Sequence, residues 1–256
     1  MKKIGIYIHI PFCIKKCKYC DFISFENKLE CENEYINALI KSINQSPKTL
    51  QELLLKSNQK EVFLKNIIVD TIYFGGGTPS CIDSKLIVQT LNAIKKSFLV
   101  EKNAEITIEI NPGTATKEKL EDYLNAGFNR ISIGLQSSKN ELLKTLGRIH
   151  DFKDFLNTYN LAKNIGFNNI NVDLMLGLPN QTLDDLKGSL KEVIKLKPNH
   201  ISIYSLIVEE NTVLEKEISQ GKLVLPTDEL ERKCITQLKR YLIKINMNIM
   251  RFQILL

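Results

Sequence analysis

The chain has 256 residues, enough for one large hydrophobic core or two modest domains, and its 43% hydrophobic and 25% charged residues are typical of a globular protein. The net charge of +6 comes from lysines spread along the chain, which argues against a nucleic-acid partner, and no apolar run is long enough to span a membrane. The first residues, MKKIGIYIHIPFC, resemble a short signal peptide, but Pro11 interrupts them and no small-residue cleavage site follows. We therefore interpret them as the first strand of a cytoplasmic protein.

Strand-like apolar segments alternate along the chain with segments of helical periodicity. The expected strands are 4–10, 70–74, 105–110, 130–134, 168–174 and 200–206. The expected helices are 33–56, 83–98, 116–125, 151–165 and 182–195, where leucine and isoleucine recur every three or four residues. Gly127 and Gly166 are expected to end two of these helices. Six β/α units in series predict an α/β fold, a partial (β/α)6 TIM-like barrel with right-handed crossovers.

Glycine, proline, cysteine and polar residues gather where each expected strand ends. A cysteine loop follows the first strand, and the later strands end in or lead into GGGTPS (75–80), EINPG (109–113), GLQSS (134–138), DLMLGLP (173–179) and YSL (204–206). Core packing alone would not place such residues at the same end of every strand. Because barrel enzymes carry their chemistry at the carboxyl ends of the strands, this pattern predicts a functional site there.

The cysteine loop contains Cys13, Cys17 and Cys20 in a C-x3-C-x2-C spacing. Thiolates suit zinc and iron–sulfur clusters, but structural zinc usually takes four ligands, and no second C-x2-C pair exists. His9 is a conceivable fourth ligand, although its alternate strand position favours packing or a hydrogen bond. A 4Fe–4S cluster held by three thiolates would leave one iron open. The scattered cysteines, Cys31, Cys81 and Cys234, are expected to be inert small hydrophobes.

This cysteine loop, followed by GGGTP after the second strand, resembles the radical S-adenosylmethionine (SAM) superfamily. The resemblance implies that SAM chelates the open iron and is cleaved to methionine and a 5′-deoxyadenosyl radical. It also implies contacts between the glycine-rich edge and the amino end of SAM, and between Glu109 and the ribose. The alternatives are zinc or a plain electron-transfer cluster, a tight turn at the glycines, and a solvated strand-end charge at Glu109.

Five longer segments carry a finer resemblance: YIHIPFCIKKCKYCDF, YFGGGTPS, IGLQSSKNELLKTLGRIH, DLMLGLPNQT and ISIYSLIVEENTVL. Over residues 4–215 they are similar to oxygen-independent coproporphyrinogen III oxidases and the related haem chaperones of the HemW type. The resemblance implies that Tyr7, Gly76 and Glu109 contact the cluster-bound SAM. It implies that a second SAM, or the pocket wall, involves Tyr19, Gly77, Thr78, Gln136, Arg148, Asp173 and Ser205.

Two departures from the oxidase favour the chaperone branch. No long extension precedes the first strand, and Phe22 stands where the oxidase has a further cysteine. That branch is thought to bind haem and deliver it to membrane-associated respiratory haemoproteins. The alternatives are an oxidase that acts on porphyrinogen by SAM radical chemistry and an inactive fragment. His150 and His200 are conceivable haem ligands, but His200 opens its strand at the end far from the expected site.

The expected domains are a radical SAM partial barrel, residues 1–206, and the start of a helical C-terminal region, 207–256. Members of the resembled family continue well beyond this length, so we expect the second region to be truncated. The last residues, FQILL, are expected to form an exposed apolar tail.

Overall fold

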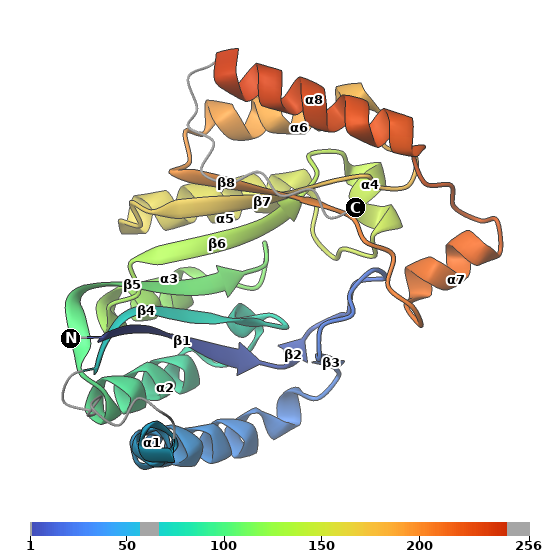
Figure 1. Ribbon diagram of the computed structural model, residues 1–256. Helices are drawn as coiled ribbons and strands as arrows, with labels where there is room; N and C mark the ends of the chain where they lie inside the picture. The colour runs from blue at the N-terminus through green and yellow to red at the C-terminus, as the bar shows by residue number, and fades with distance from the viewer. Residues whose placement is uncertain (1, 57–66, 245–256) are drawn as a thin grey trace.

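The computed structural model describes residues 2–56 and 67–244. Within this part of the chain, one parallel sheet has six strands in chain order: β1 (Lys2–Ile10), β4 (Ile67–Gly76), β5 (Val100–Ile110), β6 (Arg130–Gln136), β7 (Ile170–Leu176) and β8 (His200–Ser205). The sheet curls into a half-barrel, and helices cover its convex face (Figure 1). The predicted fold class is thereby confirmed.

The helices between the strands also follow the prediction. They are α1 (Glu32–Lys56), α2 (Ser84–Ser97), α3 (Lys117–Ala126), α5 (Phe152–Ile165) and α6 (Leu183–Lys195). Asp83, Thr116, Asp151 and Thr182 precede four of them as N-caps, and each side chain accepts a hydrogen bond from a first-turn N–H group. Gly127 and Gly166 adopt φ of 102° and 119° at the ends of α3 and α5, as left-handed caps require.

The two faces of the sheet differ in chemistry because side chains alternate along each strand. Isoleucines such as Ile8, Ile108 and Ile133 are buried in the core that the convex face forms with the helices. The concave face instead carries polar and aromatic residues, among them Glu109 and Asp173. An ordinary barrel fills its interior with packed apolar side chains. This half-barrel therefore offers an open trough of polar and aromatic side chains at the position of a barrel core.

Several boundaries and short elements differ from the prediction. Strand β4 continues through Gly75 and Gly76, which pair with His9 and Ile10, so part of the expected glycine loop is strand. The short strands β2 (Phe12–Cys13) and β3 (Phe25–Glu26), the 3-10 helices η1 (Leu29–Cys31) and η3 (Pro79–Cys81), and helix α4 (Asn140–Thr145) were not expected. Their lengths are too small for a periodic pattern, and tertiary contacts fix them instead.

The segment expected to be helical beyond residue 206 contains α7 (Val213–Ser219) and α8 (Asp228–Lys244). Helix α8 lies across α6 (Figure 1), and Cys234, Ile235 and Leu238 join the main hydrophobic core. The expected apolar tail at 252–256 lies outside the described residues. Within those residues, every helix is too short or too polar to cross a bilayer.

Candidate cofactor site at the carboxyl ends of the strands

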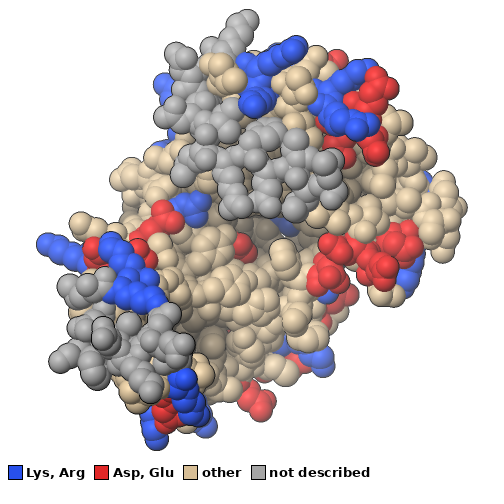
Figure 2. Space-filling model, in the orientation of Figure 1, with Lys and Arg blue, Asp and Glu red and all other residues tan. Residues whose placement is uncertain are grey.

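A cavity of about 480 Å³ opens at the carboxyl ends of the strands, beside the cysteine loop. Eleven of the predicted site residues line it: Cys13, Cys17, Tyr19, Cys20, Gly76, Gly77, Thr78, Glu109, Gln136, Arg148 and Asp173. The described surface in the middle of the view is largely uncharged, while basic and acidic side chains lie around its edge (Figure 2). The volume falls within the range of about 300–1,000 Å³ usual for small-molecule and cofactor sites.

The three loop cysteines border this cavity, and all six cysteines of the chain are free. The Cys13 sulfur accepts a hydrogen bond from Thr78 Oγ1 at 3.6 Å, and the Cys17 sulfur accepts one from Arg148 Nη1 at 3.5 Å. Burial raises the pKa of the Cys20 thiol. Among the described residues, no group of three or more His, Cys, Asp or Glu side chains is arranged to hold a metal ion.

Lys18 fastens the middle of the cysteine loop to two distant segments. Its backbone N–H donates to the Leu146 carbonyl at 3.0 Å, and its carbonyl accepts from the Leu214 N–H at 2.9 Å. Its ammonium group lies 2.7 Å from a Glu217 carboxylate oxygen, and both side chains are partly buried. The segments after β6 and β8 therefore hold the loop in place.

Close packing within the protein itself requires glycine at each position of the glycine run. A Cβ at Gly76 would lie 2.6 Å from the His9 ring, and one at Gly77 would lie 2.6 Å from the Phe12 carbonyl oxygen. Gly76 also has φ +112°, which side chains disfavour. At Gly75, a Cβ would crowd Tyr73 and the Glu109 carboxyl group. The three glycines bring β4 against β1 and the cysteine loop, and Gly76 and Gly77 then border the cavity.

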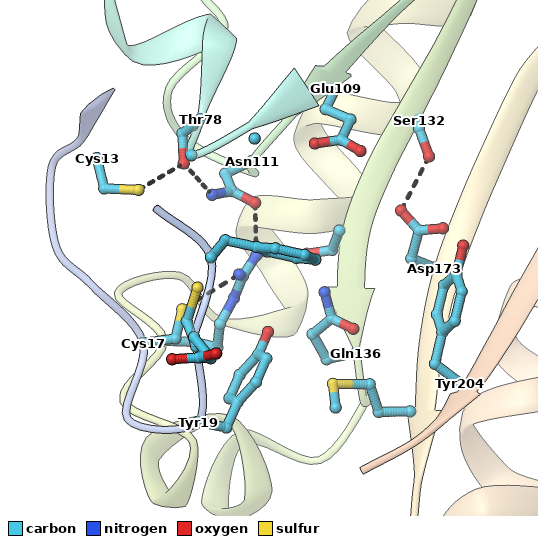
Figure 3. Close-up of a pocket in the computed structure, with 18 of the residues that line it drawn as sticks. Cys13, Cys17, Tyr19, Thr78, Glu109, Asn111, Ser132, Gln136, Asp173 and Tyr204 are labelled. Atoms are coloured by element: carbon cyan, nitrogen blue, oxygen red, sulfur yellow. Dashed lines mark hydrogen bonds between the residues drawn. The ribbon is translucent and has the colours of Figure 1, made fainter. Parts of the chain in front are cut away.

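Two partly buried carboxyl groups stand on the concave face (Figure 3). Glu109 accepts a hydrogen bond from the Tyr73 hydroxyl at 2.6 Å, and burial raises the pKa of Glu109. Asp173 accepts from Ser132 at 2.9 Å and from Asn171 at 2.7 Å, yet burial still raises the pKa of Asp173. Both carboxyl groups thus face the cavity with their charge incompletely compensated by the protein.

Arg148 is partly buried beside the cysteine loop. Its guanidinium group donates to the Asn111 side-chain oxygen and the Gly134 carbonyl, both at 2.7 Å. Burial opposes its charge, but the Tyr19 hydroxyl and the Cys17 thiol offset that effect, so the pKa of Arg148 is raised. Burial also raises the pKa of Tyr19.

Gln136 ends strand β6 with φ +71°, a left-handed conformation unusual for a residue other than glycine. Its side-chain nitrogen would lie 3.1 Å from a Cβ at Gly134, so these two residues are close packed at the cavity wall. Such local strain is often found at functional sites.

Two predicted site residues do not line the cavity. Tyr7 lies beside it, with its ring stacked on Tyr73 at a centroid distance of 6.1 Å and more than half of its surface exposed. Ser205 ends β8, where its neighbours Tyr204 and Leu206 line the cavity instead. The alternation of strand side chains explains this one-residue difference.

The histidines have other partners. His9 Nε2 lies 2.7 Å from the Ile23 carbonyl oxygen, which agrees with the expected hydrogen bond. His150 is buried with Nδ1 unpartnered, and burial together with the Arg148 charge lowers the pKa of His150 to about 3. His200 pairs with Arg130 at the opposite end of the sheet. None of these three side chains lines the cavity.

The cavity residues that sequence reasoning had not selected include Tyr73, Asn111, Ser132, Met175 and Tyr204. Tyr73 and Ser132 lie inside strands. The only signal for them in the sequence was the two-residue spacing that places them on the same face as predicted site residues of the same strand. Asn111 and Tyr204 belong to the strand-end motifs EINPG and YSL, so their position was a usable signal.

Comparisons with known proteins agree with this geometry. A match to the radical SAM superfamily spans residues 7–193. The haem chaperone HemW of Haemophilus influenzae is 41% identical over 82% of this chain and 52% of its own length. HemW of Escherichia coli is 38% identical over 88% of this chain and 55% of its own length. The chain thus spans about half the length of the curated relatives it matches.

Among solved structures, coproporphyrinogen III oxidase (HemN) from Escherichia coli superimposes with a TM-score of 0.78 and 26% identity. The match covers 95% of this chain and 52% of the oxidase chain. An archaeal Elp3 from Methanocaldococcus infernus, at 18% identity and a TM-score of 0.62, shares the fold. The chain belongs to the radical SAM superfamily, in the group that contains the haem chaperone HemW and the oxidase HemN.

Proposed function

We propose that this chain binds a 4Fe–4S cluster through Cys13, Cys17 and Cys20, binds SAM beside it, and serves in handling haem as a chaperone. The observation that carries the proposal is the shared cavity: three thiols from one loop border the same space as the glycine edge, Glu109 and Arg148. Three soft sulfur donors fit an iron–sulfur cluster with one iron left for an outside ligand.

The remaining cavity residues fit the two ends of SAM. The edge formed by Gly76, Gly77 and Thr78 would accept the amino acid end, and Glu109 would accept hydrogen bonds from the ribose hydroxyls. Arg148 and Gln136 would bind a carboxylate or a second SAM. When bound, the cluster supplies an electron to SAM. The protein's part is to hold both groups together and limit the access of water.

An apolar and aromatic wall supports the haem part of the proposal. Tyr204, Met175, Leu206 and Ile207 line the cavity, and Tyr204 stands on the side away from Cys13 (Figure 3). A flat, largely apolar macrocycle would bury surface against such a wall. Because His9, His150 and His200 all stand apart from the cavity, we propose that haem binding here relies on this wall and not on a histidine ligand.

We also propose that the chain delivers haem to a membrane-associated respiratory haemoprotein and that it is located in the cytoplasm. The likeness to the HemN structure supports a second candidate, oxidation of coproporphyrinogen III. Phe22 at the cavity mouth is the residue that favours the chaperone. Turnover of porphyrinogen in an anaerobic assay would favour the oxidase activity over the chaperone function.

The test is anaerobic reconstitution of the purified chain, followed by electron paramagnetic resonance of the reduced protein with and without SAM. We expect a 4Fe–4S signal that changes on addition of SAM. Haem titration, followed by absorbance, should then give saturable binding. Cys13→Ser should lose the cluster, whereas Cys31→Ser, outside the cavity, should keep it. A zinc-loaded or cluster-free wild type would contradict the proposal.

A further inference from the structure

The side chain of Asn111 lies between two of the cavity cysteines (Figure 3). Its nitrogen donates to Thr78 Oγ1 at 2.8 Å, and that hydroxyl donates to the Cys13 sulfur at 3.6 Å. Its oxygen accepts from Arg148 Nη2 at 2.7 Å, while Arg148 Nη1 donates to the Cys17 sulfur at 3.5 Å. One amide group therefore stands at the centre of a chain of hydrogen bonds that joins two sulfurs.

An amide side chain is needed at this position because it donates one of these hydrogen bonds and accepts the other. A threonine hydroxyl has a single hydrogen, and the Asn111 N–H group occupies an acceptor position of Thr78, which leaves that hydrogen for Cys13. The Asn111 oxygen holds one nitrogen of the planar guanidinium, which orients the other nitrogen toward Cys17. A carboxylate could not donate the hydrogen bond to Thr78, and an apolar side chain could form neither hydrogen bond.

The fold fixes Asn111 from its backbone as well. Its N–H group donates to Ser80 Oγ at 3.2 Å, and its carbonyl accepts from Thr114 Oγ1 at 2.8 Å. Strand β6 leaves room for the amide because residue 134 is glycine, where a Cβ would lie 3.0 Å from the Asn111 oxygen. The residue is thus held at a set place between η3, its own turn and strand β6 by the protein alone.

We infer that Asn111 is a positioning residue that keeps hydrogen bonds on the sulfurs of Cys13 and Cys17 and thereby raises the reduction potential of the cluster they hold. This inference rests on the proposed cluster. Hydrogen bonds to ligand sulfurs stabilise the reduced cluster because it carries one more negative charge. Asn111 does this through Thr78 and Arg148, without a contact of its own to either sulfur.

The test is a redox titration of the reconstituted cluster, followed by absorbance and electron paramagnetic resonance. For Asn111→Ala we expect the equilibrium constant for reduction to fall by about tenfold, which is a shift of about 59 mV to lower potential for one electron. Thr78→Val should shift the potential in the same direction by less, and Thr78→Ser should restore it. In the Thr78→Val background, Asn111→Ala should have a smaller effect than in the wild type.

Asn129→Ala is the matched control, because Asn129 also binds β5 through its amide but at the end away from the cavity, on Ile106 N–H and the Ala104 carbonyl. It should leave the potential unchanged. An unchanged potential in both Asn111→Ala and Thr78→Val, with the cluster present, would overturn this inference alone. A wild type without a cluster would overturn the proposed function and this inference with it.

Discussion

At the scale of single residues, two glycines predict opposite effects of the same substitution. A Cβ at Gly77 would lie 2.6 Å from the Phe12 carbonyl oxygen and 2.9 Å from that of Ile10. Both neighbours are backbone, which cannot rotate away, so Gly77→Ala should lower the free energy of unfolding by about 1–3 kcal/mol. In helix α6, Gly188 has no atom within 4 Å of the position that a Cβ would take. Gly188→Ala should therefore raise the free energy of unfolding by about 0.5–1 kcal/mol, because alanine loses less conformational freedom in a helix than glycine does.

Urea unfolding of the cluster-free chain would measure both values. A Gly77→Ala variant as stable as the wild type would show that the packing at Gly77 has been misread.

Asp173 predicts a pH dependence of stability. Because burial raises its pKa in the folded chain, folding favours the protonated form. Its contribution to stability is therefore greatest below the unfolded pKa of 3.8 and is lost as pH rises through the folded pKa. Asp173→Asn removes the ionisation, so its free energy of unfolding relative to wild type should increase as pH rises across this window, as urea titrations at several pH values would measure.

The matched control has the opposite sign. Burial alone would raise the pKa of Asp185, but hydrogen bonds from Thr182 outweigh it and lower the pKa. The carboxylate therefore stabilises the folded chain above pH 3.8, and that contribution is lost as pH falls through the folded pKa. Asp185→Asn should thus be least harmful in acid. Parallel pH profiles for the two variants would contradict the assignment.

At the scale of elements, the link between Lys18 and Glu217 makes α7 a support for the cysteine loop. Glu217→Gln removes a partly buried ion pair, and the amide of Leu214, bound to the Lys18 carbonyl, should then exchange its hydrogen about two- to fivefold faster. Hydrogen exchange read by mass spectrometry would measure it. Glu192→Gln breaks an exposed pair on α6 and should leave Leu214 unchanged. Unchanged exchange in both variants would mean that the ion pair does not hold the loop.

The elements also show which parts of the fold and of the site could be predicted from the sequence. Long periodic segments, with Gly127 and Gly166 as helix ends, were enough for the strands and the main helices, because local propensity and global fold agree there. Parallel strands bring their carboxyl ends to one edge, which is why most of the predicted site residues meet in one cavity. Ser205 does not line the cavity, because a shift of one residue along a strand reverses the face. The bridge through Asn111 joins segments far apart in sequence, and no local pattern encodes it.

At the scale of the whole molecule, the half-barrel has an open trough of polar and aromatic side chains where a closed barrel would have a packed apolar core. A bound cluster and SAM would fill part of this trough and stabilise only the folded chain. Reconstitution should therefore raise the melting temperature by about 5–10 °C, and removing iron with a chelator should reverse the change. Differential scanning calorimetry would measure it. Cys13→Ala should show no rise, and a rise in that variant would mean that the stabilisation comes from another site.

The contacts of Lys18 have a consequence for synthesis on the ribosome. The loop with the cysteines is made first, but Glu217 lies 199 residues further along the chain. At roughly 5–20 residues per second, the loop waits about 10–40 s before its last contact can form. During that interval three thiols are exposed to oxygen and to adventitious metals. We therefore expect the proposed cluster to be inserted after translation, and growth under air to lower the fraction of the protein that acquires it.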